Sequence, residues 1–290
     1  MFAALLALAL SGQQPSDSRI RAMLARVAEE AEVFRQKAPR LLAQETLRQR
    51  ALEVPRRFRP RVGKAAAEPP KPEYRTRQII SEYTFGYFRD SPGVLHEFRQ
   101  MTSVDGRELL APTRAREKLA LGLQSADDRS KRRMLEEFER HGLRAAAAGF
   151  GQAILLFSRP RLVQYAFTWE GHARVGAVPA VILRFRQSGG QGALTIFEGR
   201  RMLRAALAGQ LWLRDPDGLP LRIVLEATRQ QDGQTVRDQA TVEYIMSPHG
   251  VLVPASVLRR HFVGDVLTVE DVFQYSPFRL FAADAEVKFP

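Results

Sequence analysis

The 290-residue sequence contains no cysteine. Disulfide bonds, thiol catalysis, thiolate metal ligands and a lipid-modified cysteine are therefore excluded. Long apolar segments are scarce as well, and the clearest one, Phe2 to Leu10, is too short to span a bilayer. Stability must come from an ordinary hydrophobic core, for which 290 residues with 45% hydrophobic content are sufficient.

Recognisable catalytic motifs are also missing. No serine lies in a Gly-x-Ser-x-Gly elbow, and no histidine has a helical partner four residues away or a carboxylate at a metal-binding spacing. The five histidines are His96, His141, His172, His249 and His261. We therefore expect no enzymatic activity, no metal and no cofactor, although histidines and acids that converge in one cleft would reopen the case for a hydrolase.

Two glycine-containing segments resemble ligand loops only superficially. Gly149-Phe150-Gly151 precedes an apolar run, whereas a phosphate-binding loop follows a strand and opens a helix. Asp215-Pro216-Asp217-Gly218 starts like an acidic calcium loop, but the remaining ligands are absent. We interpret the second segment as a tight turn.

The N-terminus has the character of an export signal. Residues 1–12 combine an apolar run with Ser11 and Gly12, as in the hydrophobic and cleavage regions of a secretory signal, although no basic residue precedes Arg19. The alternative is a buried N-terminal helix. Together with the absence of cysteine, this segment predicts a protein exported to a bacterial periplasm or secreted.

The chain is strongly basic, with a formal net charge of +12 and a pI near 10.6. The densest basic cluster lies in a proline-rich segment, residues 55–74, and comprises Arg56, Arg57, Arg59, Arg61 and Lys64. We interpret this segment as an extended linker whose charges face solvent. It is also a candidate surface for an anionic membrane or an envelope protein. Nucleic acid is not expected, because export removes the usual partner.

Residues 13–54 are predicted to form a helical arm. Ser16, Asp17 and Ser18 offer caps, and apolar residues then recur at helical spacing at positions 20, 23, 24, 27, 31, 34, 38, 41 and 42. Pro39 should break or kink the helix, which we expect to resume toward Glu53.

Residues 75–290 are predicted to form a curved antiparallel sheet, so the fold class is mainly β (α+β). Alternating apolar residues predict a hairpin over residues 78–104 and further strands over residues 161–169, 179–187, 193–198, 209–214, 220–229, 235–246, 251–263, 266–275 and 285–289. Close turns favour hairpins over crossovers. A helical insertion is expected at 112–145, whereas residues 145–157 fit either a buried helix or a strand.

Aromatic residues are concentrated on the predicted strands and strand ends. An apolar sheet face must be covered by helices or filled by a ligand. The candidates for an apolar ligand cavity are Tyr83, Phe85, Tyr87, Trp212, Phe262, Phe273 and Tyr275. The alternative is that the same side chains form an ordinary core.

One strand-turn-strand segment resembles a known family. Gly209-Gln210-Leu211-Trp212-Leu213-Arg214-Asp215, followed by Leu219-Pro220-Leu221-Arg222-Ile223, is similar to the corresponding part of periplasmic lipoprotein-sorting carriers (LolA/LolB-like). The later Val253-Pro254 and Phe273-x-Tyr275-x-x-Phe278-Arg279-x-Phe281 fit the same order. The resemblance covers residues 75–290 and implies an incomplete β-barrel covered by helices, with an apolar cavity for lipid.

Two hypotheses about function follow. In the first, the protein binds a lipid, a lipoprotein acyl chain or a similar apolar ligand in the cell envelope, and its sheet encloses a partly open cavity. In the second, it is an envelope scaffold or protein-interaction module with a packed core and an exposed apolar stripe over residues 20–42.

Overall fold

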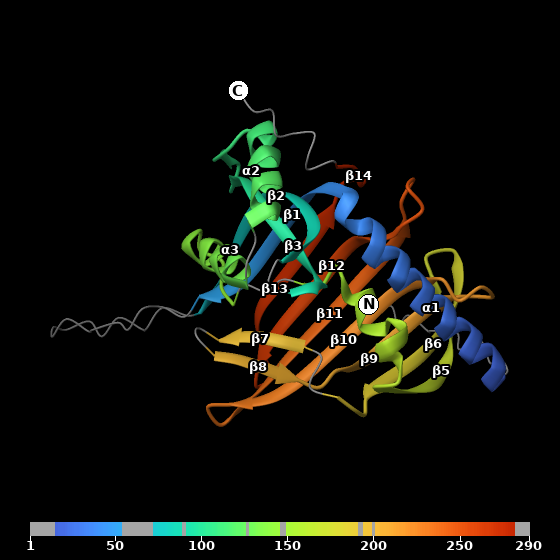
Figure 1. The fold of residues 1–290 in the computed structure, drawn as a ribbon. Helices are drawn as coiled ribbons and strands as arrows, with labels where there is room; N and C mark the ends of the chain where they lie inside the picture. The colour runs from blue at the N-terminus through green and yellow to red at the C-terminus, as the bar shows by residue number, and fades with distance from the viewer. Residues whose placement is uncertain are drawn as a thin grey trace, which may run out of the picture.

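An open antiparallel sheet of twelve strands dominates the fold (Figure 1), which confirms the expected mainly β class. The computed structural model describes residues 15–53, 72–88, 91–125, 128–145, 149–190, 194–198 and 201–281. The neighbouring strands follow the order β4-β3-β2-β1-β13-β12-β11-β10-β9-β6-β5, and β14 pairs with β1. The sheet is not closed, because its path ends at β4 and β5.

The described strands are β1 (Leu41–Glu53), β2 (Glu73–Phe88), β3 (Ser91–Val104), β4 (Arg107–Glu108), β5 (Tyr165–Val175), β6 (Val178–Gln187), β7 (Leu194–Glu198), β8 (Arg201–Ala205), β9 (Ala208–Arg214), β10 (Pro220–Gln231), β11 (Gln234–Met246), β12 (Leu252–Val263), β13 (Val266–Tyr275) and β14 (Arg279–Leu280). The alternating pattern predicted β2, β3, β5 to β7 and β9 to β13, whereas β1, β4, β8 and β14 were not predicted. Strands β7 and β8 form a separate two-stranded sheet. The expected strand at 285–289 lies outside the described residues.

The N-terminal helix α1 (Asp17–Lys37) begins and ends where the sequence predicts. The Ser16 side chain caps it by accepting a hydrogen bond from the Arg19 backbone N–H. After Lys37 the chain makes one 3₁₀ turn, η1 (Ala38–Arg40), which contains Pro39. The apolar stripe of α1 is buried against the sheet through Met23, Val27 and Phe34.

The helix does not resume after Pro39, so that prediction was wrong. Residues 41–53 form strand β1, which pairs with β2 on one side and β13 on the other. Ala43, Leu47 and Ala51 are buried and lie four residues apart, a spacing that fits both a helix and one face of a strand. The sheet therefore begins at Leu41, and the N-terminal helix is limited to Asp17–Lys37.

The helical insertion is confirmed as α2 (Pro112–Ser125) and α3 (Asp128–Arg140). Helix α2 covers the outer face of β2 and β3, where Leu119 packs with Phe98 and Leu42. In the described part of the ambiguous stretch the chain forms the short helix η2 (Ala153–Phe157), and the short helix α4 (Arg159–Leu162) follows it. We call the described residues 143–145 and 149–157 the strap.

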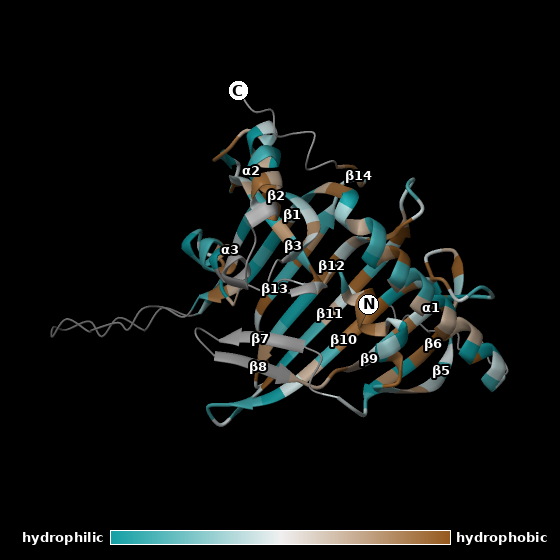
Figure 2. Ribbon diagram, in the orientation of Figure 1, coloured by the Kyte–Doolittle hydropathy of each residue, from teal (hydrophilic) through white to brown (hydrophobic). Residues whose placement is uncertain are grey.

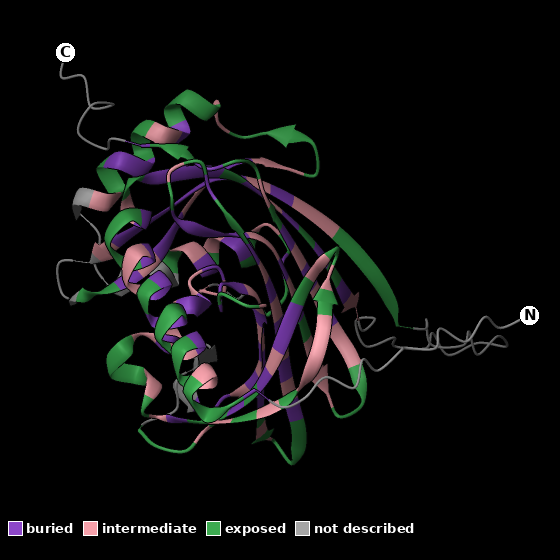
Figure 3. Cartoon of the chain, turned by 90° about the vertical axis from the view of Figure 1, so that its right-hand side faces the viewer, coloured by how far each residue is buried: buried purple, intermediate pink, exposed green. Residues whose placement is uncertain are grey.

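The sheet has an inner face covered by α1 and the strap, and an outer face on the opposite side (Figure 3). Hydrophobic and hydrophilic residues alternate along the long strands (Figure 2). The buried inner positions pair in register across the sheet, for example Val242 with Val257 and Val257 with Phe273. This register assigns each side chain of the long strands to one of the two faces.

Across the ranges described here, no helix has both the length and the apolar character needed to cross a membrane.

Gly209 is expected to tolerate no side chain. Its φ is +156°, and a Cβ there would lie 1.9 Å from the backbone oxygen of Val224 on the paired strand. Gly209→Ala should therefore lower the free energy of unfolding by more than about 3 kcal/mol. Gly122→Ala, in an exposed helix position with nothing within 4 Å, should instead raise it by about 1 kcal/mol. Urea denaturation measures both, and equal effects would contradict the prediction.

Candidate functional site

Five of the seven predicted cavity aromatics share the inner face at one end of the sheet. The rings of Tyr83 and Phe85 are 5.0 Å apart, and those of Tyr83 and Tyr275 are 4.9 Å apart. Phe273 lies on the same face, two residues before Tyr275. Tyr87 follows Phe85 at the same spacing, and its hydroxyl donates to the Arg35 carbonyl of α1 at 2.7 Å.

These aromatic side chains contact one another closely. Tyr83, Phe85 and Phe273 are each at most 1% exposed. Phe34 of α1 packs edge-on against Phe85 at 4.9 Å, and Phe278 stacks on Phe85 at 6.3 Å. This end of the inner face is therefore a packed aromatic core under α1.

The other two candidates lie on the outer face, so assigning them to the cavity was wrong. Trp212 alternates with the buried Leu211 and Leu213, which turns its ring away from the core. The guanidinium of Arg222 covers it at 4.7 Å. Phe262 is likewise outward, and Arg237 covers it at 4.5 Å. The basic cluster Arg56, Arg57, Arg59, Arg61 and Lys64 lies outside the described residues.

A buried charged group lies inside the aromatic cluster. Arg99 donates to both carboxylate oxygens of Glu45, at 2.6 and 2.7 Å, and forms an ion pair with Glu97 at 2.8 Å. All three side chains are at most 2% exposed. The guanidinium also lies 4.7 Å from the Tyr83 ring centre and 5.8 Å from that of Phe273. Aromatic faces and carboxylates thus surround the cation.

The three charges have different electrostatic environments. Burial raises the pKa of Glu45, and the attraction of Arg99 offsets this only in part. For Glu97 burial acts in the same direction, but Arg99 and the Gly149 N–H outweigh it, so its pKa lies below the ordinary value. Burial would lower the pKa of Arg99, yet Glu45 and Glu97 raise it well above its usual range. Glu97 is therefore the carboxylate more firmly held as an anion.

The glycine-rich segment Gly149-Phe150-Gly151 binds an anion that belongs to the protein itself. The backbone N–H groups of Gly149 and Gly151 donate to the Glu97 carboxylate at 2.8 and 2.7 Å. Gly149 has a φ of +97°. A Cβ on Gly151 would lie 2.6 Å from the Tyr83 hydroxyl, so only glycine permits this close approach.

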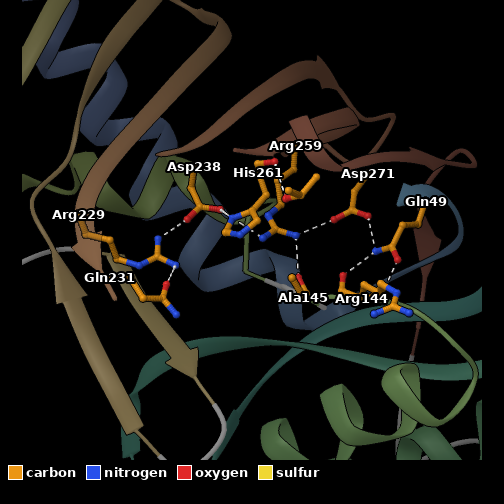
Figure 4. A network of polar contacts seen from close by, with 10 residues as sticks. Gln49, Arg144, Ala145, Arg229, Gln231, Asp238, Arg259, His261 and Asp271 are labelled. Carbon is orange, nitrogen blue, oxygen red and sulfur yellow. Dashed lines mark hydrogen bonds and ion pairs between the residues drawn. The ribbon is translucent and has the colours of Figure 1, made fainter. Parts of the chain in front are cut away.

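A second polar cluster lies at the other end of the inner face (Figure 4). Asp238 contacts Nδ1 of His261 at 2.8 Å, Arg229 at 2.6 Å and Arg259 at 3.2 Å. Arg259 continues to Asp271 at 2.8 Å. Strand β1 adds Gln49 to this row of polar side chains, since the Gln49 amide donates a hydrogen bond to Asp271 at 2.8 Å. Five strands, from β10 to β1, contribute to this row.

Side chains of both polar clusters form hydrogen bonds with the strap backbone. The Gln49 amide donates to the Arg144 carbonyl at 3.0 Å and accepts from the Arg144 N–H at 2.6 Å. Arg259 donates to the Ala145 carbonyl at 2.8 Å. Further along, the Tyr244 hydroxyl accepts from the Ile154 N–H at 3.0 Å. Sheet side chains therefore satisfy backbone groups of a segment that has little regular structure of its own.

The two aspartates of the second cluster differ in their pKa shifts. Burial alone would raise the pKa of Asp238, but the His261 and Arg259 contacts outweigh it and place the pKa well below the ordinary range. For Asp271 burial dominates over the attraction of Arg259, so its pKa is raised. Asp238 therefore stabilises the fold as an anion.

One histidine does lie against an acid, Asp238 of the second cluster. The His261 ring contacts Asp238. Within the described ranges, the Thr268 hydroxyl donates a hydrogen bond to the His261 backbone carbonyl at 3.0 Å and not to the ring. A triad would need a nucleophile on the ring's other nitrogen. The part of the chain that the structure describes also contains no group of three metal-ligating side chains.

Sequence reasoning missed the charged residues of both clusters. Glu97 and Arg99 alternate on a predicted strand, as do Arg259 and His261. Each pair lies two residues apart, on the same face as apolar neighbours. Charged residues at positions that the alternation assigns to the core could have been identified as buried ion pairs.

Comparisons with known proteins give only distant likenesses. No known protein family and no curated protein matches the sequence. A crystal structure of a DUF1329 family protein from Desulfovibrio piger is 10% identical, with a TM-score of 0.40, over 90% of this chain and 93% of that one. A crystal structure of MucB in complex with MucA(peri) is 13% identical, with a TM-score of 0.20, over 88% and 99%. Both TM-scores lie below 0.5, so neither likeness identifies a function.

Asp238→Asn should change how stability depends on pH. Because the folded-state pKa of Asp238 is lowered, its anion stabilises the fold above the unfolded pKa of about 4, and this contribution is lost as the pH falls below it. At pH 7 the variant should be about 3 kcal/mol less stable than the natural protein. Between about pH 5 and 2 the variant should then lose less of its remaining stability than the natural protein loses. Urea denaturation across this range tests it, with Asp232→Asn in an exposed turn as control.

Arg99→Met should destabilise the protein strongly. It leaves the Glu45 and Glu97 carboxylates buried without a cation, which typically costs about 3–5 kcal/mol. Arg48→Met removes the same charge from an exposed outward position of β1 and should change stability by less than about 0.5 kcal/mol. Thermal and urea denaturation of the two variants provide the measurement, and similar losses would contradict an essential buried pair.

Proposed function

We propose that this chain is an exported, non-catalytic binder of an apolar ligand, either a lipid or the acyl chain of a lipoprotein. The binding surface in this proposal is the inner face of the sheet, beneath α1 and the strap. The lipoprotein-carrier resemblance of residues 209–223 supports the same class of ligand. Export and contact of the basic 55–74 segment with an anionic membrane or envelope protein belong to this proposal as well.

The observation that carries the proposal is the nature of the layer over the inner face. That layer includes α1 and the strap, and the small β7–β8 sheet lies on the same side of the large sheet (Figure 1). The strap residues Ile154 and Phe157 are fully buried against the inner face of the sheet. The apolar surface that they cover is of the kind that an acyl chain would cover. The strap backbone is held by hydrogen bonds to Gln49, Glu97, Tyr244 and Arg259, which water can replace when the segment lifts. A ligand would thus replace the strap.

A scaffold without a ligand is the second candidate. The tight packing of Phe34, Tyr83 and Phe85 favours it, because these side chains fill the space expected for a ligand. The exposed apolar stripe that this hypothesis predicts over residues 20–42 is not observed, since Met23, Val27 and Phe34 are buried. Any scaffold function would therefore use another surface.

Native mass spectrometry of the full chain, purified after export and after cytoplasmic expression, tests the proposal. We expect an acyl-bearing mass that organic extraction removes and added phospholipid restores. Tyr244→Phe leaves the Ile154 N–H without its acceptor, so it should destabilise the strap by about 1–3 kcal/mol and speed lipid uptake. Tyr74→Phe, whose hydroxyl binds the Leu267 carbonyl at an exposed position, is the matched control. A clean mass with no uptake in any form would favour the scaffold.

A further inference from the structure

The second polar cluster, at one end of the inner face, contains more hydrogen-bond donors than carboxylate acceptors (Figure 4). The Asp238 carboxylate is shared by Arg229, Arg259 and the His261 ring. Asp271 accepts hydrogen bonds from Arg259 and from the Gln49 amide. Two carboxylates thus serve two guanidinium groups, one imidazole and one amide.

Carbonyl groups of the strap supply the acceptors that this cluster lacks. Arg259 donates to the Ala145 carbonyl at 2.8 Å, and Gln49 donates to the adjacent Arg144 carbonyl at 3.0 Å. Both donors are buried, since Arg259 is 5% and Gln49 is 1% exposed. Even with the strap in place, Nε of Arg259 is buried and has no acceptor within the described ranges. A ligand that replaces the strap must therefore bring oxygen atoms to this point.

The charge of the cluster favours oxygen atoms that carry a negative charge. Arg229 and Arg259 remain cations at any ordinary pH. The pKa of Asp238 is lowered, whereas burial raises the pKa of Asp271 and Arg259 offsets this only in part. Two guanidinium groups therefore face one firmly held carboxylate. Guanidinium groups bind carboxylate and phosphate oxygens through charge-assisted hydrogen bonds.

The opposite end of the inner face has the reverse character. Two carboxylates, those of Glu45 and Glu97, share the single guanidinium of Arg99 there. Replacing the strap would also remove the Gly149 and Gly151 N–H groups from Glu97. An anionic group is therefore disfavoured at this end, so the two ends of the inner face distinguish the two ends of a ligand.

The inner face between the two ends is apolar and long enough for one acyl chain. On β11 the inward side chains between Asp238 and Tyr244 are those of Ala240 and Val242, both at most 2% exposed. The strand rises by about 20 Å between Asp238 and Tyr244. One leaflet of the hydrocarbon core of a bilayer is about 15 Å thick. The acyl chain of a membrane lipid therefore fits along this strand.

We propose that the second polar cluster binds the oxyanion of an amphiphile, a carboxylate or phosphate headgroup, whose acyl chain lies along the apolar centre of the inner face. This inference rests on the proposed function, in which a ligand replaces the strap. The headgroup oxygens take the positions of the two strap carbonyls and accept hydrogen bonds from Gln49 and Arg259. Arg229 contributes the second positive charge. The ligand class is thus a fatty acid or an anionic lipid, in preference to a neutral molecule with the same chain.

Isothermal titration calorimetry of the full chain with dodecanoate and dodecanol tests this site. The two probes have the same chain, and only dodecanoate is charged at about pH 8. We expect dodecanoate to bind at least about tenfold more tightly, because a charged headgroup forms stronger hydrogen bonds with the cluster. Equal affinities would overturn the headgroup site and leave the proposed function standing. Binding of neither probe would overturn both.

A charge-removing variant locates the preference. Arg229→Met keeps the aliphatic stem and removes one cation, so it should weaken dodecanoate binding at least about fivefold and leave dodecanol binding unchanged. Arg237→Met removes the same charge from β11 next to Asp238 but on the outer face, where Arg237 covers Phe262, and should change either affinity less than about twofold. Circular dichroism checks the fold of both variants, and the comparison of the two probes on the natural chain needs neither.

Two further outcomes of the titrations would contradict the proposal. An equal loss of both affinities in Arg229→Met would show that Arg229 acts on the fold and not on the headgroup. Inorganic phosphate that binds as tightly as dodecanoate would assign the cluster to a free oxyanion and overturn the amphiphile.

Discussion

The interior of this protein is organised by the need to hydrogen-bond the backbone of one irregular segment. The strap crosses the inner face of a sheet, where an unpaired N–H or carbonyl is costly. Regular structure provides few of its hydrogen bonds. Gln49, Glu97, Tyr244 and Arg259 supply partners from four different strands. Inward positions of a covered sheet are normally apolar. Here several of them are polar, because their side chains form hydrogen bonds with the strap backbone.

The charged side chains among them in turn need oppositely charged partners. Glu97 could not remain an anion inside the aromatic core without Arg99, and Arg259 is compensated by Asp238 and Asp271. The result is an inner face that is apolar across its centre and charged toward both ends. The polar groups toward either end fix the position of the strap that lies over this face.

Much of the fold follows from the sequence because strand alternation is a local signal. Strands β2, β3, β5 to β7 and β9 to β13 and helix α1 follow directly from spacing, caps and turns. Strand β1 does not, since Ala43, Leu47 and Ala51 recur at a spacing compatible with a helix, while Glu45 and Gln49 occupy the inward positions between them. Five of the candidate aromatics lie together on the inner face, where they pack against one another. Trp212 lies on the outer face, so the presence of an aromatic residue on a strand does not tell which face its side chain occupies. Glu45 pairs with Arg99 from 54 residues away in the chain, and Asp238 is held from the strands on both of its sides, and no local pattern reveals either arrangement.

The position of β1 has a consequence for how the protein is made. Its Glu45 pairs with Ser81 of β2 on one side and with Tyr275 of β13 on the other. While the chain is being synthesised, one edge of β1 therefore has no partner until almost the whole polypeptide has emerged. Unpaired strand edges are prone to aggregation, and contacts between such distant residues form slowly. We therefore expect this sheet to complete its folding only after synthesis of the chain is nearly finished.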